Sequence, residues 1–359
     1  MKIMTVLGTR PEMIRLSIII KKLDGCSEHI LVHTGQNYDD SLNRTFLDDL
    51  NIRQPDFSLG VQSDTFGEQI GKILTGSEKV INKVRPDRVL ILGDTNSGLV
   101  SIVARRMGIR VYHMEAGNRC FDDRVPEEVN RRIIDHSSSV LMPYTRNSKD
   151  NLIKEGIGTN RIYVTGNPIY EVINTYKDEV DRSDIHRRLN VEPKKYFLVT
   201  MHREENVDIQ DRLSGILTGL DKVQKKYEMP VICSLHPRTR VRINRFGLKM
   251  DNRNVYFLPP FGFFDFIALE QRAFCVITDS GTVQEECCIF RVPNVTIRDV
   301  TERPETVETG SNIIAGLAPD RILDCTGTAV TENTDWQIPE EYYRTNVSST
   351  VVKIITGGG

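Results

Sequence analysis

The feature that most constrains the fold of this 359-residue chain is an alternation of short apolar runs with longer amphipathic stretches. Apolar runs of roughly four to eight residues between helical patterns are typical of strands in a parallel sheet that helices cover on both faces. The sequence therefore predicts an α/β fold. The expected strands are 3–7, 29–33, 88–92, 111–114, 140–142, 162–164, 196–200, 231–235, 255–258, 275–278, 293–297 and 312–314.

These strands divide evenly around the polar segment 176–193, and the chain is too long for one ordinary hydrophobic core. We therefore expect two Rossmann-like, doubly wound domains, residues 1–170 and 171–339, with the active site in the cleft between them. Amphipathic patterns predict helices that include 11–23, 39–50, 65–84, 212–227 and a last helix at 340–355.

Composition narrows the classes of function. A charged fraction of 27% with a formal net charge of −2 gives no electrostatic reason to expect nucleic acid as a partner. No apolar run reaches the ~18 residues of a membrane-spanning helix, and the first residues look like a buried strand, not a signal peptide. Seven cysteines without a Cys-x-x-Cys pair favour reduced thiols in a cytoplasmic protein.

Three acidic residues stand where ligands bind in open α/β sheets, outside the carboxyl ends of the strands. Asp94 follows the strand 88–92, Glu115 follows the strand 111–114, and Glu127 lies in the first turn of a helix that opens at a proline. Together they predict a site that moves protons on a small molecule. A single acid after a strand is more often a helix cap.

The segment Gly8-Thr9-Arg10-Pro11 joins the first strand to the first helix. Proline fits the first helical turn, and the helix N-terminus offers backbone N–H groups and a positive dipole end to an anion. Arg10, with Arg15 about a turn further on, adds guanidinium groups that suit phosphate. The alternative is a helix cap whose arginine pairs with a nearby acid.

A second anion site is predicted in the other half, where Ser280 and Gly281 lie between a strand and a helix. The helix N-terminus suits a phosphate. Glu286, one to two turns into that helix, can accept hydrogen bonds from the two hydroxyls of a ribose. A plain Ser-Gly helix cap is equally compatible with this pattern.

His202 follows the strand 196–200 and suits a diphosphate or a proton transfer, with a hydrogen-bonded core histidine as the alternative. Phe261 lies in an aromatic loop that could stack a base, although such aromatics are more often core residues. The chain has no Gly-x-Gly-x-x-Gly, no Walker loop and no metal-ligand spacing, so we expect neither a nicotinamide nor an ATP nor a metal site.

Taken together, these motifs resemble those of the non-hydrolysing UDP-N-acetylglucosamine 2-epimerase family. They follow one another in the same order as in that family, and the resemblance spans nearly the whole chain. The resemblance implies two domains like those of the B-type glycosyltransferases (GT-B), closing on a UDP-sugar, usually in a homodimer, with a last helix (340–356) that crosses back to the first domain. The motifs are Gly8-Thr9-Arg10-Pro11-Glu12, Gly93-Asp94-Thr95, Glu115-Ala116-Gly117, Pro126-Glu127-Glu128-x-Asn130-Arg131, His202-Arg203-x-Glu205-Asn206, Thr278-Asp279-Ser280-Gly281 with Glu285-Glu286, and Arg298-Asp299-x-Thr301-Glu302-Arg303-Pro304-Glu305.

The resemblance also implies the reaction. Loss of UDP from C1 acidifies the C2–H bond, so a base completes an elimination to a 2-acetamidoglucal; UDP then re-adds while a proton returns to the opposite face. No cofactor is needed. By resemblance, the acid/base carboxylates are Asp94, Glu115 and Glu127, with His202 close to the diphosphate or the transferred proton. The residues that would hold UDP are Arg10, Arg15, His202, Phe261, Ser280, Gly281 and Glu286.

Within the family, the segments 113–122, 236–240 and 260–263 look like those of enzymes that convert UDP-2-acetamido-2,6-dideoxy-L-talose to UDP-N-acetyl-L-fucosamine, a precursor of surface polysaccharides. Bacterial UDP-GlcNAc enzymes usually carry Gln-His-Arg in a second, activating substrate site, whereas this chain has Gln36-Asn37-Tyr38-Asp39. We therefore expect the 6-deoxy-L-sugar as substrate, with UDP-GlcNAc as the alternative. The rival classes are a GT-B glycosyltransferase, a hydrolysing epimerase and a nucleotide-sugar sensor without enzymatic activity.

Overall fold

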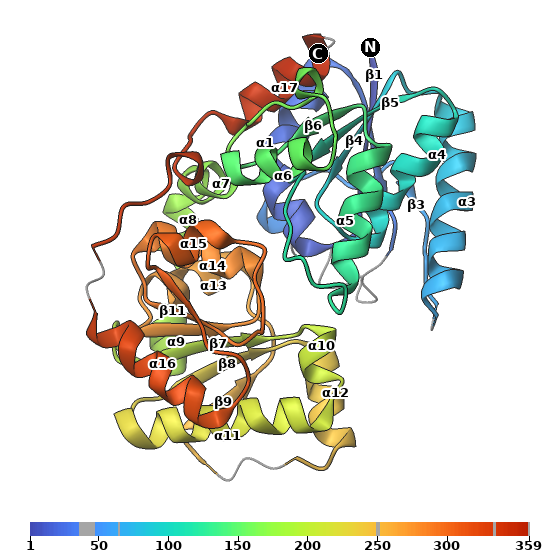
Figure 1. Cartoon of the computed structure of the whole chain (residues 1–359). Coiled ribbons are helices and arrows are strands. Elements are labelled where there is room, and N and C mark those ends of the chain that lie inside the picture. Colours follow the sequence, from blue (N-terminus) through green and yellow to red (C-terminus); the bar gives the residue numbers. More distant parts are fainter. Residues whose placement is uncertain (36–46, 64, 249–251, 333–334, 358–359) are drawn as a thin grey trace. The chain divides into compact units, whose positions relative to one another are not determined.

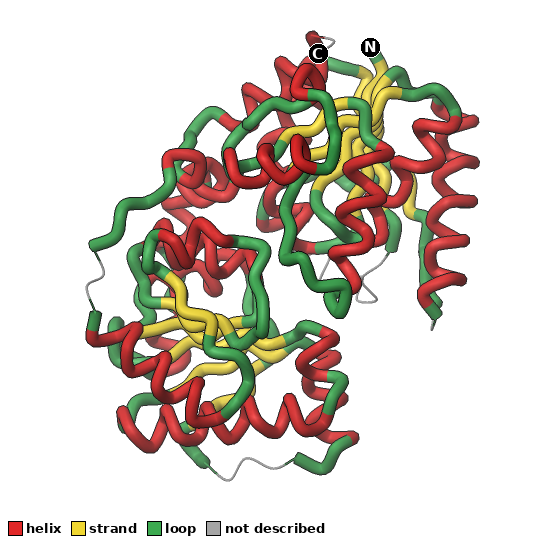
Figure 2. The backbone as a smooth tube through the Cα atoms, in the orientation of Figure 1, coloured by secondary structure: helices red, strands yellow, loops and turns green. Residues whose placement is uncertain are grey.

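The computed structural model describes residues 1–35, 47–63, 65–248, 252–332 and 335–357. The chain forms two compact units: unit 1 comprises Met1–Thr175 and Glu340–Gly359, and unit 2 comprises Tyr176–Pro339. Each unit contains one six-stranded sheet (Figure 1), and helices lie around each sheet (Figure 2).

The sheet of unit 1 is parallel and has the order β3-β2-β1-β4-β5-β6, which is the order of a dinucleotide-binding doubly wound fold. The strands are β1 (Lys2–Leu7), β2 (Glu28–His33), β3 (Phe57–Ser58), β4 (Arg88–Leu92), β5 (Arg110–Met114) and β6 (Val140–Met142). The helices and 3₁₀ turns are α1 (Arg10–Cys26), α3 (Phe66–Val84), η1 (Asn96–Leu99), α4 (Val100–Arg106), α5 (Pro126–Ser137), α6 (Arg146–Lys154), η2 (Thr159–Arg161), α7 (Ile169–Thr175), η3 (Glu340–Tyr342) and α17 (Val347–Gly357).

The sheet of unit 2 repeats this topology, with the order β12-β11-β10-β7-β8-β9. The strands are β7 (Phe197–Met201), β8 (Val231–Leu235), β9 (Val255–Leu258), β10 (Cys275–Thr278), β11 (Asn294–Thr296) and β12 (Asn312–Ile314). The helices are α8 (Lys177–Asp181), α9 (Ile185–Leu189), α10 (Glu204–Val207), α11 (Gln210–Tyr227), α12 (Pro237–Arg245), α13 (Phe263–Gln271), α14 (Gly281–Phe290), α15 (Pro304–Glu308) and α16 (Pro319–Thr331).

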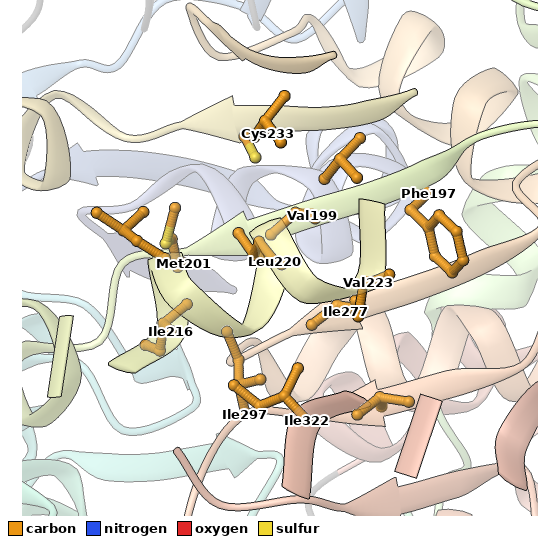
Figure 3. Packing of buried hydrophobic residues seen from close by; sticks show 14 of the residues in the cluster. Phe197, Val199, Met201, Ile216, Leu220, Val223, Cys233, Ile277, Ile297 and Ile322 are labelled. Atoms are coloured by element: carbon orange, nitrogen blue, oxygen red, sulfur yellow. The ribbon is translucent and has the colours of Figure 1, made fainter. Parts of the chain in front are cut away.

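Each sheet is stabilised by burial of its apolar side chains against the flanking helices. In unit 2, Phe197 and Val199 of β7 and Leu220 of α11 belong to one buried cluster, which Figure 3 shows from close by. In unit 1, Val89 of β4 and Val100 of α4 belong to an equivalent cluster. The central strands β4 and β10 are buried at nearly every position, which explains their continuous apolar runs in the sequence.

The C-terminal helix α17 belongs to unit 1, although unit 2 precedes it in the chain. It lies beside α1 (Figure 1). Val351 and Ile355 are buried, and the Ser348 backbone N–H donates to Glu171 Oε2 of α7 at 2.7 Å. The chain therefore returns to its first sheet after completing its second.

The sequence predictions of local structure were wrong at two places. Residues 162–164 do not form a strand; Ile162 makes only an isolated bridge to Leu141, and the sixth strand of unit 1 is the two-residue β3 at the opposite edge. The predicted helix at 340–355 begins only at Val347, after the short turn η3. The polar segment 176–193 contains the two short helices α8 and α9. Most of the predicted helix 39–50 lies outside the described residues.

Candidate active site

The order of the sheet of unit 1 reverses between β1 and β4, and ligands of such folds bind outside the carboxyl ends of the strands at this switch point. Thr9 caps α1, and Arg10 is the first residue of the helix. Glu12 crosses the switch point: its Oε2 accepts from the Thr9 backbone N–H at 2.7 Å, and its Oε1 accepts from Thr95 Oγ1 at 3.0 Å. Burial raises the pKa of Glu12 to about 7, even though these donors lower it in part.

Asp94 lies in the turn after β4. Its Oδ2 accepts from Arg131 Nε at 2.8 Å and from Arg131 Nη2 at 2.7 Å. Asn130, the neighbour of Arg131 on α5, donates its side-chain N–H to the Asp94 backbone carbonyl at 3.0 Å. The side chains of α5 therefore hold the Asp94 carboxylate and its backbone in one place.

Glu115 follows β5 directly and has φ +64°, in the left-handed region that side chains other than glycine rarely adopt. Such a conformation costs roughly 1–3 kcal/mol. Arg85 and Arg291 adopt it as helix C-caps, whereas Glu115 adopts it directly after a strand. Its Oε2 accepts from Arg15 Nη1 at 2.7 Å, and both side chains are buried. Arg15, which the sequence assigned to UDP, thus contacts a predicted catalytic carboxylate.

The turns that carry Asp94 and Glu115 lie against each other. The Gly93 backbone N–H donates to the Met114 carbonyl at 3.0 Å, and a Cβ added to Gly93 would lie 3.7 Å from Glu115 Oε2. Gly93 has φ +74°, so this turn requires a residue that tolerates the left-handed region.

Glu127 is the second residue of α5 and is half-buried. It stands four residues before Arg131, so the two side chains share the helix face that points to Asp94. Glu128, in contrast, is fully buried and accepts from the Phe121 backbone N–H at 3.1 Å and from Arg131 Nη1 at 2.8 Å. Burial opposes ionisation of Glu128, but these donors hold its pKa below the usual value. Asp94 and Glu115 therefore lie at adjacent strand ends of unit 1, and Glu127 lies on α5, the helix whose Arg131 contacts Asp94.

The switch point of unit 2 lies between β7 and β10, and Asp279 bridges it. The fully buried Asp279 carboxylate accepts from the backbone N–H groups of His202 and Arg203 at 2.9 Å each, and from the Asn206 side chain at 3.2 Å. His202 Nδ1 lies 3.2 Å from Asp279 Oδ1, while its side chain is 40% exposed. Asp279 therefore fixes the turn that presents His202 at the ligand edge.

Ser280 is the N-cap of α14, and Gly281 is the first residue of the helix. A Cβ at Gly281 would lie only 2.7 Å from Glu302 Oε1, so a side chain at this position would require the Glu302 carboxylate or the start of α14 to move. Glu302 itself accepts from Arg298 Nη1 at 2.7 Å and from Arg203 Nη2 at 3.2 Å. The N-terminus of α14 thus stands within a group of charged, largely buried side chains.

Glu286 lies six residues into α14 and is buried, with the fully buried Glu270 of α13 as its neighbour. Burial, together with the charge of Glu286, raises the pKa of Glu270 well above its usual value, and Cys287 Sγ lies 3.3 Å from Glu270 Oε1. Phe261 is half-buried in the segment before α13.

Sequence reasoning missed several residues that organise these edges. Arg131 and Asp279 lie in motifs named in the sequence analysis, where their charges could have marked them as functional residues. Glu12 also lies in one of these motifs and His113 begins the segment 113–122, but the sequence does not show their roles, which depend, like that of Asp135, on contacts across the sheet edge. The motif Gln36-Asn37-Tyr38-Asp39 lies outside the described residues.

Within the described ranges, no three His, Cys, Asp or Glu side chains are grouped as a metal would require. All seven cysteines are free thiols. No helix in the described part of the chain is both long and apolar enough to cross a membrane.

Residues 21–356 match the family model described as UDP-N-acetylglucosamine 2-epimerase. The chain belongs to this family. A UDP-N-acetylglucosamine 2-epimerase of Methanococcus maripaludis is 39% identical over 363 residues, which cover 99% of this chain and 98% of the relative. A crystal structure of the Methanocaldococcus jannaschii UDP-GlcNAc 2-epimerase in complex with UDP-GlcNAc and UDP has a TM-score of 0.95 and 39% identity, with all of both chains covered.

The family also includes other specificities. A UDP-2,3-diacetamido-2,3-dideoxy-D-glucuronate 2-epimerase of Pseudomonas aeruginosa is 37% identical over 339 residues, 92% of each chain. A glycosyltransferase of lipopolysaccharide biosynthesis shares the fold alone, with a TM-score of 0.62 and 12% identity over 99% of this chain and all of the other. The chain is therefore an isomerase of the non-hydrolysing 2-epimerase family, with the GT-B architecture expected from its sequence.

Proposed function

We propose that the protein inverts C2 of a UDP-N-acetylhexosamine without a cofactor. The observation that carries this proposal is the pair of arginine-held carboxylates at the carboxyl ends of the adjacent strands β4 and β5: Asp94 with Arg131, and Glu115 with Arg15. Acid/base inversion needs proton-accepting groups at fixed positions, because misplacing a reacting group by about 1 Å can cost about 10²-fold in rate.

The reaction proceeds by elimination and re-addition. The C1–O bond to UDP breaks and the C2 proton passes to a carboxylate of unit 1, which leaves a 2-acetamidoglucal and UDP. UDP then re-forms the C1–O bond while a carboxylate delivers a proton to the opposite face of C2. Asp94, Glu115 and Glu127 act on the sugar in this scheme, and closure against water keeps the glycal from hydrolysis.

Two anion-binding features support the assignment of UDP. The α14 N-terminus at Ser280 and Gly281 offers backbone N–H groups to a phosphate, and Asp279 fixes His202 beside it in the chain's second sheet edge. In unit 1, Arg10 opens α1. Glu286 is the acceptor for the ribose hydroxyls, and Phe261 is the candidate for stacking the base.

UDP-GlcNAc is the first substrate to test, because the relatives described above are named for it at up to 39% identity. UDP-2-acetamido-2,6-dideoxy-L-talose is the second, on the strength of the segments 113–122, 236–240 and 260–263 alone. The Pseudomonas relative shows that enzymes this similar act on different amino sugars. We also propose a cytoplasmic homodimer, for which sedimentation at twice the chain mass is the test.

Proton NMR in deuterium oxide tests the reaction. The purified enzyme with one UDP-sugar and no acceptor should produce the C2 epimer and incorporate deuterium at C2. A glycosyltransferase would leave the sugar unchanged, and a hydrolysing epimerase would release UDP in stoichiometric amounts with free N-acetylmannosamine. Loss of exchange in the Glu127→Gln variant excludes a sensor, because binding alone needs no ionisable group there. Absence of exchange with every UDP-amino sugar tried contradicts the proposal.

A further inference from the structure

The buried side chain of His113 on β5 connects two structural elements behind the carboxylates of unit 1. Its Nδ1 lies 2.9 Å from Asp135 Oδ1 of α5, and its Nε2 lies 2.9 Å from the Gly93 carbonyl oxygen. Each ring nitrogen therefore faces an oxygen that can accept a hydrogen bond, one from the Asp135 carboxylate and one from the Gly93 backbone. The side chain is 1% exposed, which leaves it no access to a ligand.

Asp135 extends this contact to the loop after β5. Its Oδ2 accepts from the Gly117 backbone N–H at 3.1 Å and pairs with Arg119 at 2.8 Å. Burial opposes ionisation, but the hydrogen bond and charge of His113, with the charge of Arg119, hold the pKa of Asp135 below its usual value. One buried carboxylate thus anchors α5 to the loop that carries Glu115.

The residues fixed in this way lie on the same turn, loop or helix as the three predicted acid/base carboxylates. Gly93 precedes Asp94, Gly117 lies two residues after Glu115, and Asp135 stands on the same helix as Glu127. Both the Gly93 and the Glu115 backbones are left-handed, at φ +74° and +64°. Such backbones persist only where surrounding contacts determine them.

We propose that His113 is a positioning residue. Its Nε2 holds the Asp94 turn through the Gly93 carbonyl, and its Nδ1 holds helix α5 and the Glu115 loop through Asp135. It touches no substrate. The inference rests on the proposed function, because it assigns His113 to the placement of carboxylates that carry out epimerisation.

Two isosteric variants separate the two contacts. In His113→Gln, the side-chain amide can place its N–H where Nε2 lay and keep the bond to the Gly93 carbonyl. In His113→Asn, the shorter amide replaces Nδ1, keeps the bond to Asp135 and leaves the Gly93 carbonyl without its donor. A positioning role therefore predicts that activity and stability rank the two variants in opposite orders. His113→Gln, which keeps the contact to the Asp94 turn, is the more active variant, and His113→Asn, which keeps the contact to Asp135, is the more stable.

The expected result is a fall in kcat of about 10- to 100-fold for His113→Asn, with KM and the UDP dissociation constant within about 2-fold of wild type. His113→Gln should lose less than about 5-fold in kcat. The matched control is His29→Gln, because His29 is also buried and pairs with Asp24 at 2.6 Å, but near the amino end of β2. That variant should lower the melting temperature and leave kcat unchanged.

Hydrogen exchange gives a readout that does not depend on activity. The Gly93 amide, which donates to the Met114 carbonyl, should exchange faster in His113→Asn and not in His113→Gln or His29→Gln. Equal kcat in wild type and His113→Asn, or equal exchange of this amide in all variants, overturns the positioning role. A wild-type enzyme that exchanges no C2 proton overturns the proposed function, and the amide exchange then still decides whether His113 holds the turn.

Discussion

At each of the two switch points, a buried carboxylate bridges the two strands between which the strand order reverses, but the residues that do so differ. In both units the strand order reverses between the first and the fourth strand. Glu12 reaches from α1 to Thr95 in unit 1, whereas Asp279 reaches from β10 back to the backbone of His202 and Arg203 in unit 2. The fold therefore decides where a ligand edge forms, and the bridging residue decides what that edge presents.

What each edge presents differs in chemistry. In unit 1, arginines hold two carboxylates, Asp94 and Glu115, at fixed positions. In unit 2, the Asp279 carboxylate accepts hydrogen bonds from the His202 and Arg203 backbone N–H groups. The turn after β7 that these bonds fix carries His202, and the N-terminus of α14 follows Asp279 in the chain. We infer that unit 1 carries the acid/base chemistry and unit 2 the nucleotide, and the following experiments can separate the two roles.

The largest effect is expected from Asp94→Asn. Removing the charge should lower kcat by about 10²- to 10⁴-fold, because general acid/base groups contribute rate enhancements of this size. UDP affinity, measured by calorimetry, should stay within about 3-fold. The control is Asp87→Asn at the amino end of β4, where Asp87 accepts from the Lys2 backbone N–H at 2.7 Å. A loss of UDP affinity equal to the loss of kcat would contradict the division of roles.

Glu12 gives a pH-dependent effect on stability that belongs to unit 1. Its pKa is about 7 in the folded protein and about 4.5 unfolded, so the native state binds more protons between these values and stability falls as pH rises. The difference corresponds to about 3 kcal/mol. Glu12→Gln should remove this slope in urea unfolding measured from pH 5 to 8, and the exposed control Glu28→Gln should not. An identical slope in wild type and Glu12→Gln would show that Glu12 does not titrate there.

Asp279→Ala tests the bridge of unit 2. It leaves the His202 and Arg203 backbone N–H groups without their acceptor, which costs about 1–3 kcal/mol. UDP affinity should therefore fall by about 10-fold or more, whereas Asp279→Asn, which keeps one acceptor oxygen, should lose less. Asp320→Asn on the exposed face of α16 is the control. Unchanged calorimetric affinity in Asp279→Ala would remove UDP binding from this edge.

The smallest effect is expected from Gly281→Ala. The new Cβ meets Glu302 Oε1 at 2.7 Å, so the Glu302 carboxylate or the first turn of α14 must move. KM for the UDP-sugar should therefore rise by about 10-fold, equivalent to about 1.4 kcal/mol. Gly71→Ala in α3 meets nothing within 4 Å and should stabilise the helix by about 0.5–1 kcal/mol without changing KM. A kcat effect larger than the KM effect would place Gly281 closer to the reacting atoms than we infer.

The sequence predicted the fold well where burial leaves a continuous apolar run, as at β4 and β5. It failed at β3, since a two-residue edge strand has no periodicity, and at 162–164, where an apolar run ends in a single bridge. The acidic residues after these strands were also predicted, because each follows the end of a continuous apolar run. The partners of Arg15 and His113 were not, because both contacts join residues about 20 to 100 positions apart, and only the folded sheet edge brings them together.

The position of α17 has a consequence for how the protein is made. Because this last helix packs against α1, one face of α1 stays uncovered while unit 2 is translated. At about 5–20 residues per second, that delay is roughly 10–35 s. In nascent chains stalled before Val347, α1 should therefore be sensitive to proteases. Unit 2 has time to form its own core before α17 packs against α1.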